Sequence, residues 1–159
     1  MQILALVLIA AAVLADQLIK LLVVNQLKPV GSIEVIPGLL DFTYVQNYGA
    51  AFGILQNQKW FFIVATSLVS LVLIVLLFTY KNHNLLSYTA SILIVGGGIG
   101  NLIDRIHLGF VVDYIHLSFF PPVFNFADCC VTVGTFLLII HVIFFAESKA
   151  KHSMKHLEK

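Results

Sequence analysis

The chain has 159 residues, of which 60% are hydrophobic and 11% are charged, with a formal net charge of +1. This composition, with a mean hydropathy of +0.99, excludes an ordinary soluble domain and is typical of a polytopic membrane protein with one domain. The small net charge excludes the basic surface that nucleic-acid binding needs, so no DNA or RNA partner is expected.

Four segments reach or approach the roughly 20 apolar residues that a membrane-spanning helix needs. They cover about residues 3–24, 60–78, 85–103 and 123–145. The sequence therefore predicts an all-α membrane protein, a four-transmembrane-helix bundle that forms a single polytopic domain over residues 1–159.

The first segment carries Asp16 and Lys20. Their i,i+4 spacing places them on one face of a helix and predicts an ion pair. The pair is interpreted as a clamp that holds this segment to the bundle, and the alternative is that Lys20 steadies another group in the site. Val13-Leu14-Ala15 resembles a signal-peptide cleavage site, but no Lys or Arg precedes the apolar run, so we expect the segment to remain.

The loop over about residues 25–59 contains two stretches, 32–36 and 39–45, that are rich in strand-forming residues and flank Pro37-Gly38. This pattern predicts a small β-hairpin at the membrane interface. The sequence Asn47-Tyr-Gly-Ala-Ala-Phe-Gly53 follows as an interfacial loop, and Trp60 is expected to anchor the next helix at the interface.

Basic residues indicate the orientation of the spans. Lys81 lies between the second and third spans, and the tail over about residues 146–159 holds Lys149, Lys151, Lys155 and Lys159. We expect both termini in the cytoplasm, so the loops at about 25–59 and 104–122 face outward.

The third segment ends in a glycine cluster, Gly96-Gly-Gly-Ile-Gly100. The cluster lacks the third glycine of a dinucleotide-binding fingerprint and follows no predicted strand, which disfavours nucleotide binding. Gly96 and Gly100 form a GxxxG pair, which predicts a groove for a partner helix.

Asn101, Asp104 and Arg105 share one helical face just beyond these glycines. Asp104 or Asp16 is expected to satisfy the charge of Arg105, and Asn101 is expected to reach a neighbouring helix. Structural support and substrate positioning both remain open for these residues.

Asp113 and Asp128 are the remaining ionisable residues near the outer face. Asn125 and Asp128 fit an N-cap with an acidic residue three positions later, so capping alone is one interpretation of Asp128. Asp113 lies in the apolar stretch Val111-Val112-Asp113-Tyr114 without an adjacent cation. Two carboxyls in a poorly hydrated site share one proton, as in an aspartic protease, so the pair predicts this chemistry.

Other protease chemistries and metal sites fit the sequence less well. There is no HExxH motif, and no Ser or Cys has a convincing adjacent base. Cys129 and Cys130 are interpreted as small buried hydrophobic residues. No metal or other cofactor is expected.

Five ordered blocks carry a resemblance to a known family: DQLIK at 16–20, NYGAAFG at 47–53, GNLIDR at 100–105, VVDY at 111–114 and FNFAD at 124–128. In these blocks the chain resembles signal peptidase II, the lipoprotein signal peptidases, which are bacterial membrane aspartic proteases. The resemblance covers nearly the whole chain. It implies removal of signal peptides from prolipoproteins, by cleavage on the amino-terminal side of a cysteine that carries diacylglycerol.

The resemblance also implies roles for individual residues. Asp113 and Asp128 would form the catalytic pair, and Asp104 is a competitor that Arg105 is expected to keep ionised. The supporting residues would be Asp16, Lys20, Asn47, Gly49, Asn101, Arg105 and Asn125. The expected protein is a monomer in the bacterial cytoplasmic (inner) membrane, in contact with membrane lipids and with diacylglyceryl-prolipoprotein signal peptides.

Three other functions are alternatives to this hypothesis. A small proton-coupled transporter would use the same carboxylates, but they gather at one face, and His141 is interpreted as a packed or interfacial residue. A presenilin-type protease is disfavoured because Asn101 stands where its GxGD signature has the catalytic aspartate. A non-catalytic assembly subunit would tolerate Asp→Asn at either position of the pair.

Overall fold

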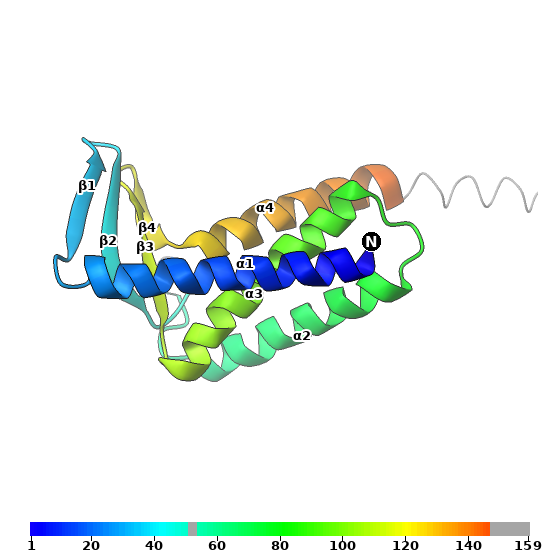
Figure 1. Ribbon diagram of the computed structural model, residues 1–159, viewed down its shortest axis with the longest axis horizontal. Helices are drawn as coiled ribbons and strands as arrows, with labels where there is room; N and C mark the ends of the chain where they lie inside the picture. Colours follow the sequence, from blue (N-terminus) through cyan, green and yellow to red (C-terminus); the bar gives the residue numbers. More distant parts are fainter. Residues whose placement is uncertain (51–53, 147–159) are drawn as a thin grey trace, which may run out of the picture.

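The computed structural model describes residues 1–50 and 54–146. Four long helices run side by side and form a bundle, and a small sheet covers one end of it (Figure 1). We call this the sheet end. The helices are α1 (Gln2–Leu22), α2 (Lys59–Thr79), α3 (Leu85–His107) and α4 (Phe126–His141), and short π-helical turns, η1 (Val23–Leu27) and η3 (Val142–Ala146), extend α1 and α4.

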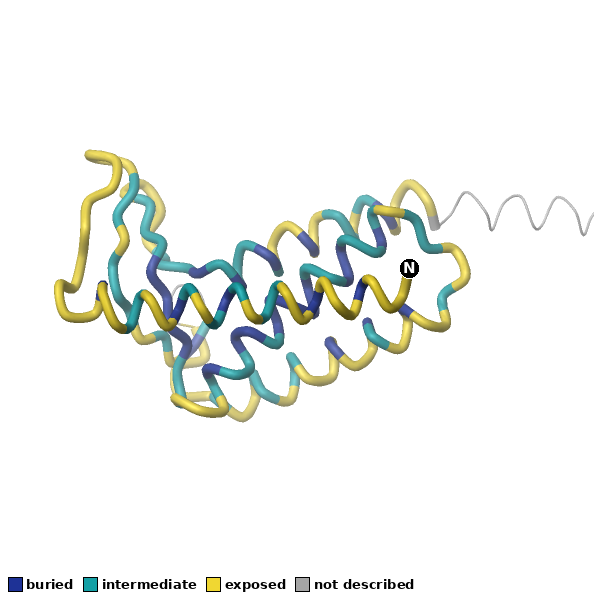
Figure 2. Tube along the Cα trace, in the orientation of Figure 1, coloured by how far each residue is buried: buried dark blue, intermediate teal, exposed yellow. Residues whose placement is uncertain are grey.

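Within the described residues, four helices are long and apolar enough to cross a membrane, judged by length and composition. Their most apolar windows have mean hydropathies of 1.5 to 2.9. Exposed positions follow the outward faces of the helices, whereas buried positions lie where helices face one another and where the bundle meets the sheet (Figure 2). The predicted four-helix membrane architecture is therefore confirmed.

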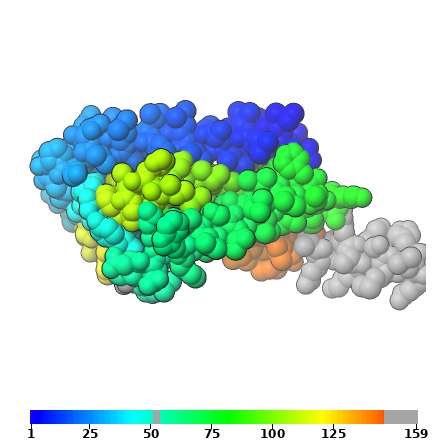
Figure 3. All heavy atoms as spheres, turned by 90° about the horizontal axis from the view of Figure 1, so that it is seen from below, coloured from blue at the N-terminus to red at the C-terminus, as the bar shows by residue number. Residues whose placement is uncertain are grey.

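Helix α3 is the centre of the bundle, since 44% of its apolar window is buried against 17% for each of the other three helices. It packs against α1, α2 and α4, and α1 lies beside it along the bundle (Figure 3). A compact apolar core between α1, α2 and α3 consists of Ala5, Ile9, Leu73, Leu77, Ile94 and Val95.

The glycine cluster explains how α3 contacts α1 and α4 closely. A Cβ added to Gly96 would lie 2.9 Å from Ala12 of α1, and one added to Gly97 would lie 2.4 Å from the carbonyl oxygen of Ala127 in α4. The predicted groove for a partner helix is thus occupied by α1 of the same chain, because small residues let backbones approach.

The sheet has four antiparallel strands in the order β1-β2-β3-β4. Strands β1 (Ser32–Ile36) and β2 (Leu40–Asn47) form the predicted hairpin across the Pro37-Gly38 turn. In this turn Gly38 has φ +70°, a conformation that favours glycine.

Strands β3 (Val111–Leu117) and β4 (Phe120–Phe124) were not predicted, because residues 104–122 were expected to form a loop. Helix α3 instead continues to His107, and α4 begins at Phe126 rather than near Val123. Pro121 and Pro122 are tolerated in β4 because it is an edge strand with an irregular register opposite His116 and Leu117. Residues 51–53 of the NYGAAFG block and the tail lysines lie outside the described residues.

Candidate active site

Buried polar side chains gather where α1, α3, α4 and β3 meet at the sheet end. Asp16, Lys20, Asn101, Asp104, Asp113 and Asn125 are each at most 8% exposed, and Asp128 is half-buried. Burying a charged group without a partner costs several kcal/mol or more, so the partners of these groups define the site.

The start of α4 positions Asp128. Asn125 is the N-cap residue, and its Oδ1 accepts a hydrogen bond from the backbone nitrogen of Asp128 at 2.9 Å. In return, Asp128 Oδ2 accepts from the backbone nitrogen of Asn125 at 3.2 Å. The predicted cap is present, and it leaves Asp128 Oδ1 to accept from Nδ2 of Asn101 at 2.7 Å.

Strand β3 carries Asp113, which is 1% exposed. Its Oδ1 accepts from Nδ2 of Asn125 at 2.6 Å, and its Oδ2 accepts from Nδ2 of Asn47 at 2.8 Å. Burial and, second, the charge of Asp128 raise the pKa of Asp113 to about 7, although the two amide hydrogen bonds act in the opposite direction.

A chain of amide side chains links the two aspartates. Asn125, which binds Asp113, also donates from Nδ2 to Oδ1 of Asn101 at 3.2 Å, and Asn101 in turn binds Asp128. The structure therefore brings together two carboxyls that are fifteen positions apart in the sequence. Two coupled carboxyls with different surroundings can serve as an acid and a base in one reaction.

Lys20 forms the predicted ion pair with Asp16, with 2.9 Å between Nζ and Oδ2. It also lies 3.0 Å from Oδ2 of Asp104 and donates to Oδ1 of Asn101 at 2.8 Å. The expectation that Arg105 would engage Asp104 is therefore wrong, because Asp104 points toward α1 and accepts from the backbone nitrogen of Val112 at 3.0 Å. These contacts join α1, α3 and β3.

Arg105 makes different contacts from those predicted. Among the described residues it forms no ion pair with Asp16 or Asp104, and it donates to the carbonyl oxygens of Gly49 at 3.2 Å and Asn101 at 3.4 Å. Its guanidinium carbon lies 4.6 Å from the ring centroid of Phe62 in α2, a cation–π contact.

Gly49 connects the loop after β2 to the site. Its backbone nitrogen donates to Oδ1 of Asn47 at 2.9 Å, so Asn47 bridges Gly49 and Asp113. A Cβ at Gly49 would lie 2.7 Å from the carbonyl oxygen of Ile54, which leaves no room for a side chain.

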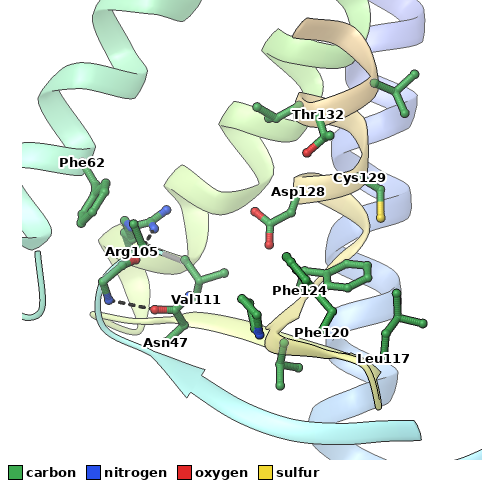
Figure 4. Close-up of a pocket in the computed structure, with 16 residues that line it drawn as sticks. Asn47, Phe62, Arg105, Val111, Leu117, Phe120, Phe124, Asp128, Cys129 and Thr132 are labelled. Carbon is green, nitrogen blue, oxygen red and sulfur yellow. Dashed lines mark hydrogen bonds between the residues drawn. The ribbon is translucent and has the colours of Figure 1, made fainter. Parts of the chain in front are cut away.

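A cavity of about 630 Å³ opens beside these groups. Asp128, Arg105 and Asn47 form its polar part, and Figure 4 shows Phe62, Phe124 and Thr132 around it. Asp113 is not among the described residues that line the cavity, but its partner Asn47 and its neighbour on β3, Val111, do line it. Further apolar lining comes from Leu117, Phe120, Pro122, Val123, Val131 and Val133.

The apolar residues that line the cavity were not predicted from the sequence. Phe62, Phe120 and Thr132 belong to apolar or aromatic runs in which no local pattern distinguishes a cavity wall from a lipid-facing or packed side chain. Cys130 is buried as predicted, but Cys129 is half-buried and lines the cavity.

The sequence also raised the questions of a metal site and of the role of His141. Within residues 1–50 and 54–146, no three His, Cys, Asp or Glu side chains are arranged to hold a metal ion. His141 is a buried residue near the far end of α4, and its Nε2 lies 3.3 Å from the hydroxyl of Tyr80.

Comparison with known proteins identifies relatives over most of the chain. The family described as Signal peptidase (SPase) II matches residues 8–144. A lipoprotein signal peptidase of Caldanaerobacter subterraneus subsp. tengcongensis is 48% identical over 140 residues, which cover 88% of this chain and 96% of that protein. The lipoprotein signal peptidase of Clostridioides difficile is 47% identical over 137 residues, with 86% and 91% covered.

Solved structures give a consistent result. A structure described as a bacterial membrane enzyme at 2.3 Å resolution superposes with a TM-score of 0.82 at 34% sequence identity, and the match covers 91% of this chain and 90% of that one. A second bacterial membrane enzyme, at 1.9 Å resolution, gives a TM-score of 0.78, also at 34% identity, with 89% and 93% covered.

Proposed function

The chain belongs to the signal peptidase II family, and from this premise we propose that it is an aspartic endopeptidase with Asp113 and Asp128 as its catalytic pair. It is a membrane protease that cleaves signal peptides. The observation that carries the proposal is the amide chain, Asn125 to Asn101, which holds the two carboxyls together beside the cavity.

The substrate class follows from the relatives, which are named lipoprotein signal peptidases. We propose that the substrate is a diacylglyceryl-modified prolipoprotein, cut on the amino-terminal side of the lipidated cysteine. The cavity supports this proposal because it combines polar groups at Asp128 and Arg105 with apolar walls from α2, α4 and β4. The scissile peptide would lie at the polar part and the apolar signal segment along the walls.

In the proposed reaction, the ionised aspartate accepts a proton from water while the water oxygen forms a bond to the carbonyl carbon. The protonated aspartate donates to the carbonyl oxygen. When the C–N bond breaks, the aspartate that took the proton from water gives it to the leaving amine. The other aspartate takes a proton back from a hydroxyl of the tetrahedral intermediate as the carbonyl re-forms, so the pair again holds one proton. Asn47, Asn101 and Asn125 orient the carboxyls through the hydrogen bonds described above.

The remaining predicted residues are proposed to support this pair. Asp16 and Asp104 hold Lys20 by ion pairs, and Asp16 also accepts from the backbone nitrogen of Ala127 at the start of α4. Gly49 and Arg105 border the substrate. We further propose a monomer in the inner membrane, in contact with lipids, with both termini in the cytoplasm and the sheet end on the extracytoplasmic side.

The proposal is tested by incubating the purified protein with a diacylated prolipoprotein and with its unlipidated form. We expect cleavage of the lipidated substrate alone. Asp113→Asn and Asp128→Asn should each lower the rate by at least about 1,000-fold, within the range that acid–base groups contribute.

Asp41→Asn is the matched control. Asp41 lies on β2 of the same sheet, is partly exposed and pairs with His116 at 3.3 Å, and it does not line the cavity. We expect it to cleave at the wild-type rate. Wild-type cleavage by either catalytic-pair variant would exclude the proposed chemistry.

A further inference from the structure

We propose that Lys20 acts through Asn101 to hold Asp128 as the ionised member of the catalytic pair, so that Asp113 carries the shared proton and Asp128 is the base. Lys20 is then a positioning residue for the reaction as well as a structural clamp. This inference rests on the proposed function and adds to it a division of roles between the two aspartates.

The contacts of Lys20 exceed those that a clamp requires. Its Nζ is buried and already lies within 3.0 Å of one carboxylate oxygen each from Asp16 and Asp104. Its third contact is Oδ1 of Asn101, at 2.8 Å. Lys20 thus donates a hydrogen bond to a neutral side chain that itself binds Asp128.

This third contact fixes which end of the Asn101 amide faces Asp128. A lysine ammonium has three donors and no acceptor, so the atom of Asn101 that faces it must be the oxygen. The amide nitrogen then faces Asp128, to which it donates at 2.7 Å. Nδ2 of Asn125 donates to the same oxygen at the longer distance of 3.2 Å, so both donors hold the amide in this orientation. Without Lys20, the amide loses its closer and charged donor, and the negative charge of Asp128 loses the cation that supports it through Asn101.

The surroundings of the two aspartates differ in the direction that this assignment requires. Asp128 lies in the first turn of α4, where the helix dipole favours negative charge, and it accepts from the backbone nitrogen of Asn125. It also lines the cavity together with the guanidinium of Arg105. An ionised base in contact with the cavity is placed to accept a proton from the attacking water.

Asp113 also feels the charges of Lys20 and Arg105, but it lacks the helix start and the backbone N–H donor that Asp128 has. It is 1% exposed, and the side chains that donate to it, Asn47 and Asn125, are neutral amides. Its pKa of about 7, raised by burial and by the negative charge of Asp128, agrees with a carboxyl that keeps its proton while its partner is ionised.

Infrared spectroscopy tests the assignment without measuring activity, because the C=O stretch of a protonated carboxyl is distinct from the bands of a carboxylate. Spectra are recorded as the pH is raised from 3.8, the ordinary pKa of an aspartate, to about 7, the pKa of Asp113. We expect a protonated-carboxyl band above pH 3.8 in the wild type and its loss in Asp113→Asn. In Asp128→Asn the band should remain but disappear at a lower pH than in the wild type, because the negative charge of Asp128 no longer raises the pKa of Asp113. Loss in Asp128→Asn with retention in Asp113→Asn would overturn the assignment.

Cleavage of the lipidated substrate as a function of pH tests the role of Lys20. Lys20→Met removes the cation but leaves Asp16 and Asp104 without their partner, and this variant can fail to fold. The double variant Lys20→Met/Asp104→Asn removes one positive and one negative charge together, so the net charge of the cluster is unchanged. Asp104→Asn alone is the matched control, since it retains the Lys20–Asn101 contact.

The acidic limb of the pH profile reports the group that must be ionised. We expect it to move to higher pH by about one unit in Lys20→Met/Asp104→Asn, the lower end of the shift that a nearby opposite charge causes, and to stay in place in Asp104→Asn. Equal profiles in the two variants, with cleavage by the wild type intact, would refute the role of Lys20 alone. Absence of cleavage by the wild type would refute the proposed function itself.

Discussion

The Nδ2 of Asn125 lies 2.6 Å from Oδ1 of Asp113, while the rest of the same side chain caps α4. One residue therefore sets both the start of the helix that carries Asp128 and the orientation of the other aspartate. Because these two tasks use different atoms, they can be separated by substitution.

Asn125→Ser should separate capping from catalysis. Serine is as good an N-cap as asparagine, but its shorter side chain cannot reach Asp113 and Asn101. We expect kcat to fall about 100-fold, as a small misplacement of reacting groups can cause. The melting temperature should also fall, because buried Asp113 and Asn101 lose a hydrogen-bond donor. Asn125→Ala should also lose about 1 kcal/mol of stability because the cap is lost. A serine variant with wild-type kcat would show that the contact with Asp113 is not needed.

The pKa of Asp113 predicts the alkaline side of the pH dependence. Because the proposed mechanism needs a protonated Asp113, we expect cleavage to decrease as the pH rises through about 7. The folded state also holds a proton between about pH 4 and 7 that the unfolded chain releases, so the stability of the wild type should decrease over that window. Asp113→Asn should remove this decrease, as measured by thermal unfolding in detergent.

The sequence predicted those features that a local pattern defines. Hydropathy indicated the four spans, Pro37-Gly38 indicated the hairpin, and the spacing of Asn125 and Asp128 indicated the cap, because each depends on neighbouring residues. The pairing of Asp16 with Lys20 also followed from helical spacing.

The features that the sequence did not predict depend on the packing of distant elements. Asp104 and Arg105 are adjacent in sequence, but adjacent helical residues point about 100° apart, so Asp104 meets Lys20 while Arg105 meets Gly49. Strand β4 was missed because its Pro121-Pro122 pair argues against a strand unless that strand is known to lie at an edge.

Gly97 and Gly98 give a matched pair for testing how the packing of α3 supports the site. A Cβ on Gly97 would meet the carbonyl oxygen of Ala127 at 2.4 Å, whereas one on Gly98 would meet only side-chain atoms, at 3.2 Å or more. Gly97→Ala should therefore push the start of α4 away and destabilise the protein by about 1–3 kcal/mol.

Because Asp128 follows Ala127 directly, Gly97→Ala should also lower kcat. Gly98→Ala should change both stability and kcat much less, since side chains can shift where backbone cannot. The two variants are compared by thermal unfolding and by cleavage rate. Equal effects would show that the close approach of α3 and α4 does not position Asp128.

Arg105 and Phe62 should act as one unit on substrate binding. The planar guanidinium of Arg105 contacts the ring of Phe62 and the carbonyl oxygen of Gly49 together, a geometry that a lysine ammonium cannot reproduce. We expect Arg105→Lys to lower kcat/KM about 10-fold, which corresponds to about 1.4 kcal/mol, mainly through KM because the pair borders the cavity.

Phe62→Leu removes the ring but keeps an apolar side chain, and it should reproduce part of this loss. Phe61→Leu, at the adjacent and 55% exposed position, is the control and should leave kcat/KM unchanged. If the two residues act together, the double variant Arg105→Lys/Phe62→Leu should be no worse than Arg105→Lys alone, because the contact can be lost only once. Additive losses in this double-mutant cycle would mean that Phe62 and Arg105 contact the substrate independently.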